Sequence, residues 1–141
     1  MSFNGSANSR ILDQYTILEQ IGEGGFSKVY QAQCRKTFED VAIKVINRQD
    51  LDKEEEKYIE NEIGVLKILD HPNIVRLIDA EYTKDNILVV MELMTGGQLF
   101  DRIVQKELFT EEEAIKIMKV LIDTIRYCHE FSVSHRDIKV L

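Results

Sequence analysis

The sequence predicts an α+β domain, with a five-stranded antiparallel sheet, one helix inserted after the third strand, and further helices behind it. Short runs of β-branched and aromatic residues alternate with Gly-rich and polar stretches, as in antiparallel strands. Other segments repeat their apolar residues at helical spacing. With 141 residues, 44% hydrophobic and 30% charged, the chain can bury the core of one compact domain.

The five predicted strands fall into two groups. Three come first and are separated by a Gly-rich stretch and a polar stretch, and two more follow the inserted helix and are joined by a polar turn at residues 82–86. The predicted strands are residues 15–21, 26–34, 41–47, 74–80 and 87–92.

Three helices are predicted from apolar spacing. The first, residues 52–69, lies between the third and fourth strands, and from Gly96 onward the spacing is helical again, beginning with a short helix. Thr110 and Glu113 form a capping box that marks the start of a longer helix extending to Phe131. The apolar residues on which these helices rest are Ile59, Ile63, Leu66, Leu69, Leu99, Ile103, Val104, Ala114, Ile117, Met118, Leu121 and Ile125.

Composition excludes several classes of function. The net charge of -7 and the dispersed basic residues predict no binding of nucleic acid. No apolar run reaches membrane-spanning length, so no membrane partner is expected. Cys34 and Cys128 could form at most one disulfide bridge, so the protein is expected in a reducing compartment, the cytoplasm. No set of His, Cys and carboxylate residues has metal-ligand spacing. Residues 1–14 are expected to form a flexible leader.

A Gly-rich cluster, residues 22–29, separates the first two predicted strands. Glycines let a backbone approach a phosphate closely enough for its amides to bind oxygen, which favours a nucleotide clamp. A plain hairpin turn is the alternative, because Ser27 stands where G-x-G-x-x-G has its third glycine. A dinucleotide fingerprint leads from a strand into a helix, whereas residues 28–33 alternate as a strand does. The context therefore favours a flap between two strands.

Lys44 is the second candidate. In an alternating strand, Ala42, Lys44 and Ile46 share one face, so a lysine projects from a surface that otherwise carries apolar residues. A lysine that protects an edge strand from aggregation is the alternative. The choice between the two depends on whether a carboxylate faces this lysine.

Glu62 is the carboxylate that the inserted helix offers. At about 100° per residue it falls between Leu66 and Leu69, within the apolar arc of the helix. A carboxylate that faces a core is costly unless a cation meets it, and Lys44 is the best-placed cation. A solvated glutamate is the alternative for Glu62 taken alone.

The chain resembles the eukaryotic protein kinases in the order and spacing of four features. These are the Gly-rich residues 22–29, the Val-Ala-Ile-Lys of residues 41–44, Glu62 ahead of His-Pro-Asn-Ile-Val at 71–75, and His-Arg-Asp at 135–137. The His-Pro-Asn-Ile-Val and Leu-Phe-Asp details are most similar to the calcium/calmodulin-dependent serine/threonine group. The resemblance implies a kinase N-lobe followed by the first helices of a C-lobe. It divides the chain into an N-lobe and hinge, residues 15–94, and the start of a C-lobe, residues 95–141.

The resemblance also implies roles for individual residues. Lys44 would hold the α- and β-phosphates of ATP and pair with Glu62, and Asp137 would orient the substrate hydroxyl, with Lys139 near the transferred phosphoryl group. Met91 would be the gatekeeper, beside backbone groups that bind adenine. The implied nucleotide-binding residues are Ile21, Gly22, Glu23, Gly24, Gly25, Phe26, Ser27, Lys28, Val29, Ala42, Lys44, Met91, Glu92 and Met94.

The implied reaction is phosphoryl transfer from Mg-ATP to Ser or Thr hydroxyls of protein substrates. Mg²⁺ is expected for the family domain, but its ligands, the catalytic-loop Asn and the D-F-G Asp, do not occur in these 141 residues. The chain alone is therefore expected to be inactive. The alternative function is a truncated kinase that acts as a nucleotide-binding or protein-interaction decoy or scaffold. Self-association is expected through an uncovered apolar stripe of the last helix, at Ile117, Leu121 and Ile125.

Overall fold

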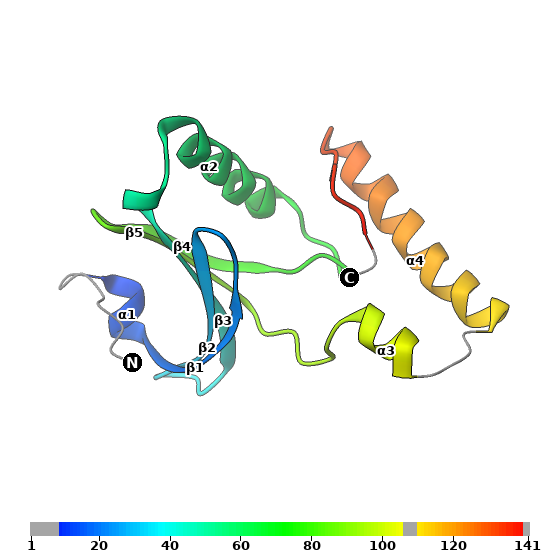
Figure 1. Cartoon of the computed structure of the whole chain (residues 1–141), viewed down its shortest axis with the longest axis horizontal. Helices are drawn as coiled ribbons and strands as arrows, with labels where there is room; N and C mark the ends of the chain where they lie inside the picture. The colour runs from blue at the N-terminus through cyan, green and yellow to red at the C-terminus, as the bar shows by residue number, and fades with distance from the viewer. Residues whose placement is uncertain (1–8, 106–109, 140–141) are drawn as a thin grey trace. The chain divides into compact units, whose positions relative to one another are not determined.

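The computed structural model describes residues 9–105 and 110–139 (Figure 1). The chain divides into two compact units. One comprises residues 1–68 and 75–93, and the other comprises residues 69–74 and 94–141. The first unit contains the sheet, and the second contains two helices near the C-terminus.

The first unit has the predicted five-stranded antiparallel sheet, with strand order β1-β2-β3-β5-β4. A helix follows the third strand, as predicted, so the α+β fold class is confirmed. The elements of this unit are α1 (Arg10–Gln14), β1 (Tyr15–Glu23), β2 (Ser27–Cys34), β3 (Asp40–Asn47), the 3-10 helix η1 (Arg48–Asp50), α2 (Lys53–Ile68), β4 (Leu77–Tyr82) and β5 (Asn86–Glu92).

The fourth strand begins three residues later than predicted, at Leu77 rather than Ile74. The Ile74 amide donates to the carbonyl of His71 in a turn, at 3.0 Å. This backbone bond takes Ile74 out of the ladder, and residues 69–74 belong to the second unit. The β-branched pair at 74–75 therefore precedes the strand instead of starting it.

The central strand β3 separates two apolar clusters because its side chains alternate between the faces of the sheet. Ile43 and its same-face neighbours Val41 and Val45 join one cluster with Leu88 and Val90. The other face carries the cluster of Ile46, Ile63, Ile87 and Val89, to which α2 contributes Ile63. The two clusters make β3 and β5 the best-buried strands of the molecule's described part.

The expected leader is wrong for residues 10–14, which form α1. Ser9 caps this helix and accepts a hydrogen bond from the Leu12 amide, at 3.2 Å. Ile11 has no exposed surface and packs into the cluster that contains Ile43. A polar segment with a single Ile-Leu pair gives little periodic signal, whereas the sheet supplies an apolar face for that pair to cover. Residues 1–8 lie outside the described residues.

The second unit contains α3 (Leu99–Gln105) and α4 (Glu111–Glu130). The predicted capping box is confirmed, since Thr110 accepts from the Glu113 amide and Glu113 accepts from the Thr110 amide. Segment 69–74 contacts α4 through Tyr127, whose hydroxyl accepts from the Asp70 amide at 3.0 Å. The ring of Tyr127 lies 4.9 Å from that of His71. Within the described residues, no helix is long and apolar enough to cross a membrane.

Candidate functional site

Lys44 and Glu62 meet in the first unit, as predicted. The Lys44 ammonium lies 3.7 Å from a carboxylate oxygen of Glu62. Lys44 is on the central strand β3, where Val29 of β2 and Val89 of β5 stand directly opposite it in the ladder. The ammonium is therefore set among β-branched side chains and faces a single carboxylate from α2.

The reason given for this pair from the sequence is wrong, because Glu62 does not face the core. Its side chain is 60% exposed. Relative to Ile63, at about 100° per residue, Ile59 and Leu66 lie within about 60° whereas Glu62 lies about 100° away. The helix ends at Ile68, so Leu69 does not extend the arc past Glu62. Such a half-exposed ion pair contributes at most about 1 kcal/mol to the stability of the fold. Its main effect is to hold the Lys44 ammonium in place.

The Gly-rich cluster forms a tight connection between β1 and β2. Gly24 donates its amide to the Ser27 carbonyl at 2.8 Å, and Gly22 stands opposite Val29 in the ladder. A Cβ on Gly24 would lie 3.1 Å from the Ser27 hydroxyl oxygen, so a larger residue there would push Ser27 aside. The strand-turn-strand form agrees with the predicted flap and with a plain hairpin alike, and it excludes a dinucleotide fingerprint.

Of the other predicted adenine-side residues, Ala42 and Met91 share the face of Lys44. Ala42 is 7% exposed and stands opposite Met91 of β5. The Glu92 amide donates to the Arg76 carbonyl at 3.1 Å, so this amide is already engaged within the sheet unit. Met94 belongs to the second unit and is 68% exposed.

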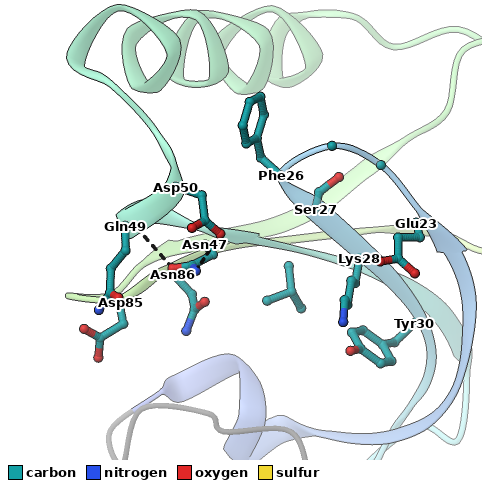
Figure 2. A pocket seen from close by; sticks show the side chains of 13 residues that line it. Glu23, Phe26, Ser27, Lys28, Tyr30, Asn47, Gln49, Asp50, Asp85 and Asn86 are labelled. Carbon is teal, nitrogen blue, oxygen red and sulfur yellow. Dashed lines mark hydrogen bonds between the residues drawn. The ribbon is translucent and has the colours of Figure 1, made fainter.

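A cavity of about 780 Å³ adjoins the Gly-rich cluster but opens on the opposite face of the sheet (Figure 2). Lys28, Tyr30 and Val45 line it, and alternation along β2 and β3 places their side chains on the face of the sheet opposite to that of Lys44. At the rim of the cavity, the Asn47 side-chain amide donates a hydrogen bond to the Asp50 carboxylate, and the Asn47 side-chain oxygen accepts one from the Gln49 backbone amide. The cavity therefore shares only the Gly-rich turn with the Lys44 face. Its lining residues are Glu23, Gly24, Gly25, Phe26, Ser27, Lys28, Tyr30, Val45, Asn47, Gln49, Asp50, Asp85 and Asn86.

Asp137 and Lys139 lie together in the second unit. The Lys139 ammonium is 3.0 Å from an Asp137 carboxylate oxygen, and both side chains are more than half exposed. The Asp137 amide donates to Nδ1 of His135 at 3.2 Å. Arg136 between them has a φ of 63°, a left-handed conformation that costs free energy in a residue with a Cβ. This loop presents an exposed carboxylate beside the ammonium of Lys139.

Comparison with known proteins identifies the family. Residues 15–140 match the family described as protein kinase domain. The chain belongs to this family. The predicted resemblance to serine/threonine kinases, including the calcium/calmodulin-dependent group, is thereby confirmed, as is the assignment to a kinase N-lobe and the start of a C-lobe.

Three relatives illustrate the similarity of this protein kinase domain. Myosin light chain kinase A of Dictyostelium discoideum is 40% identical over 125 residues, which are 89% of this chain and 42% of the relative. Serine/threonine-protein kinase H1 of Homo sapiens is 38% identical over 130 residues, 92% of this chain and 30% of the relative. Calcium/calmodulin-dependent protein kinase type 1 of Macrobrachium nipponense is 40% identical over 128 residues, 90% of this chain and 37% of the relative. The chain thus spans less than half the length of these relatives.

The described residues of this kinase domain include no group of three or more His, Cys, Asp or Glu side chains that could hold a metal ion. The two protein ligands of Mg²⁺ in the family, the catalytic-loop Asn and the D-F-G Asp, do not occur in these 141 residues either, so the side chains present do not fit that ion. The described carboxylates of the candidate site, Glu62 and Asp137, each face a lysine instead.

One residue of the Lys44 face was missed from the sequence. Val89 stands opposite Lys44 in the ladder, is 4% exposed, and lies between the face positions of Ile87 and Met91. Alternation along β5 carried the signal, because residues 87, 89 and 91 must share a face once Met91 is assigned to it.

Proposed function

We propose that this domain binds ATP on the Lys44 face of its sheet and belongs to a serine/threonine protein kinase. The observation that carries the proposal is the Lys44–Glu62 pair, at 3.7 Å, on the sheet face that also presents Val29, Ala42 and Met91. An ammonium fixed by a carboxylate is suited to phosphate oxygens, and an apolar surface beside it is suited to a purine. The serine/threonine kinases among its relatives support the substrate class.

The roles of individual residues follow in this proposal. The backbone of residues 21–29 covers the phosphates, Lys44 holds the α- and β-phosphates, and Met91 borders the adenine. Asp137 accepts the proton of a Ser or Thr hydroxyl of a protein substrate, with Lys139 beside the transferred group. The N-lobe and hinge comprise residues 15–94, the C-lobe begins at residue 95, and the protein acts in the cytoplasm.

A second candidate function is an inactive kinase domain that binds nucleotide or protein partners as a decoy or scaffold. The observation that favours it is the Lys44 face itself, because an ammonium held by Glu62 beside apolar residues can bind a nucleotide without transferring its phosphate. A nucleotide-binding scaffold would use the same Lys44 face as the kinase, so phosphate transfer, and not nucleotide binding, separates those two functions.

The test of the nucleotide site is the substitution Lys44→Met, with Lys57→Met as the matched control on the exposed surface of α2. Removing the ammonium takes away a charge-assisted bond to phosphate, so ATP affinity measured by calorimetry without metal is expected to fall roughly tenfold or more. Lys57→Met is expected to bind as the unaltered protein does. Equal affinities in Lys44→Met and the unaltered protein would contradict the assignment of this face.

Self-association is proposed through α4, which has no buried residue. Ile115, Met118 and Ile122 are about half exposed and lie within about 60° of one another around the helix, forming an apolar stripe beside the half-buried one predicted from the sequence. Light scattering is expected to give a mass above that of one chain, and Ile122→Glu is expected to lower it. Val120→Glu, a comparably exposed position on another side of α4, is the control. A single-chain mass for the unaltered protein would refute the proposal.

A further inference from the structure

The carboxylate of Glu81 on β4 caps the N-terminus of α1. One oxygen accepts from the Ser9 hydroxyl at 2.7 Å and from the Ile11 amide at 3.0 Å. The other accepts from the Arg10 amide at 2.9 Å. Burial raises the pKa of Glu81, but the bonds from Ile11, Ser9 and Arg10 outweigh it, and the net pKa lies below its usual value. A carboxylate distant in sequence thus satisfies the free amides of this helix end.

Arg10 makes a second attachment to the same strand. Its guanidinium donates to both carboxylate oxygens of Asp79, at 2.6 and 3.0 Å. The bond from Arg10 holds the pKa of Asp79 below its usual value. Planar two-point pairing of this kind fixes orientation as well as distance. Residues 9–14, called the strap from here on, are therefore bound to β4 at two adjacent same-face positions.

Directly after these attachments, the strap covers the sheet with the side chain of Ile11. Ile11 is fully buried in one cluster with Leu88 and Val90 of β5. The next residues along that strand, Val89 and Met91, point to the Lys44 face. In Figures 1 and 2, α1 and α2 lie on opposite sides of the sheet. The strap thus packs against the back of the strand whose front forms the adenine side of the proposed nucleotide site.

We propose that the strap positions β5 for nucleotide binding, with Arg10, Ile11 and Glu81 as positioning residues. The proposal rests on the nucleotide face proposed above. None of these residues lies on that face, so they act only through the strand. Because β5 is held by β3 on one side and by β4 on the other, a strap bound to β4 and packed on β5 fixes the two strands together. Releasing the strap loosens β5 and lowers ATP affinity.

The test is a charge exchange in the full chain. Arg10→Glu and Asp79→Arg each place like charges together, and the double variant restores an opposite pair. Asp13→Asn, at an exposed position of the same helix, is the control. Hydrogen exchange of residues 88–91 is measured without nucleotide, with α4 of the other unit as internal reference, and ATP affinity is measured by calorimetry.

Each single variant is expected to accelerate β5 exchange roughly tenfold and to weaken ATP binding severalfold, because charged hydrogen bonds of this strength are lost. The double variant is expected to recover both, and the control to change neither. Unchanged β5 exchange in the single variants, or no recovery in the double variant, overturns the proposal. Faster exchange with unchanged ATP affinity also overturns it. An unaltered protein that binds no ATP contradicts the proposed function, and β5 exchange then still decides whether the strap holds the strand.

Discussion

Incubated with Mg-ATP and a serine/threonine peptide, the 141-residue polypeptide is expected to transfer phosphate no faster than the background reaction. A catalytic base such as Asp137 accelerates transfer only when metal ions have neutralised and positioned the γ-phosphate. The two protein ligands of those ions, the catalytic-loop Asn and the D-F-G Asp, do not occur in these residues. Groups that act as a unit do not contribute additively, so the remaining lysines and Asp137 do not retain a share of the rate.

Labelled phosphate incorporation checks this expectation, with Asp137→Asn as the variant and Asp123→Asn on α4 as the charge-matched control. Transfer by the 141-residue polypeptide that disappears in Asp137→Asn and persists in Asp123→Asn would contradict it. In a longer polypeptide that continues through the Asn and a D-F-G segment, transfer is expected, and there Asp137→Asn should slow it by roughly 10²- to 10⁴-fold, the usual contribution of a general base. That longer polypeptide also separates the kinase from the scaffold function.

Strands β3 and β5 and the start of α4 could be predicted because each has a local cause. Alternation in residues 41–47 and 87–92 follows from the pleat, and the Thr110–Glu113 cap needs only groups three residues apart. The same alternation placed Lys44 beside Ala42 on one face. Such features depend on neighbours in sequence, so the sequence carries them completely.

The strap could not be predicted, because its causes lie about 70 residues away. Glu81 and Asp79 hold Ser9 and Arg10, and nothing near residue 10 records those carboxylates. The prediction for Glu62 failed in a different way. Its contact with Lys44 was predicted correctly, but from the incorrect argument that the Glu62 carboxylate faces the core. The apolar arc was extended to Leu69, which follows the end of α2 and belongs to the other unit.

The substitution Ile43→Ala is expected to be the most destabilising single change to the sheet unit. Ile43 has no exposed surface, lies on the central strand, and packs in the cluster that also contains Ile11 and Val90. Deleting its outer carbons leaves a cavity that tightly paired strands cannot close, at a cost of about 2–5 kcal/mol. Since whole domains are stable by only about 5–15 kcal/mol, this is a large fraction of the total.

Urea denaturation followed by tyrosine fluorescence measures this loss, since four of the five tyrosines belong to the sheet unit. Ile43→Val, which removes one methyl group, is expected to cost about 0.5–1.5 kcal/mol. Leu18→Ala, at a position 51% exposed on β1, is expected to cost no more than about 0.5 kcal/mol. The loss is expected to decrease from Ile43→Ala through Ile43→Val to Leu18→Ala, because each change in that order removes less buried volume. Equal losses in Ile43→Ala and Leu18→Ala would show that Ile43 does not lie in the packed centre of the sheet.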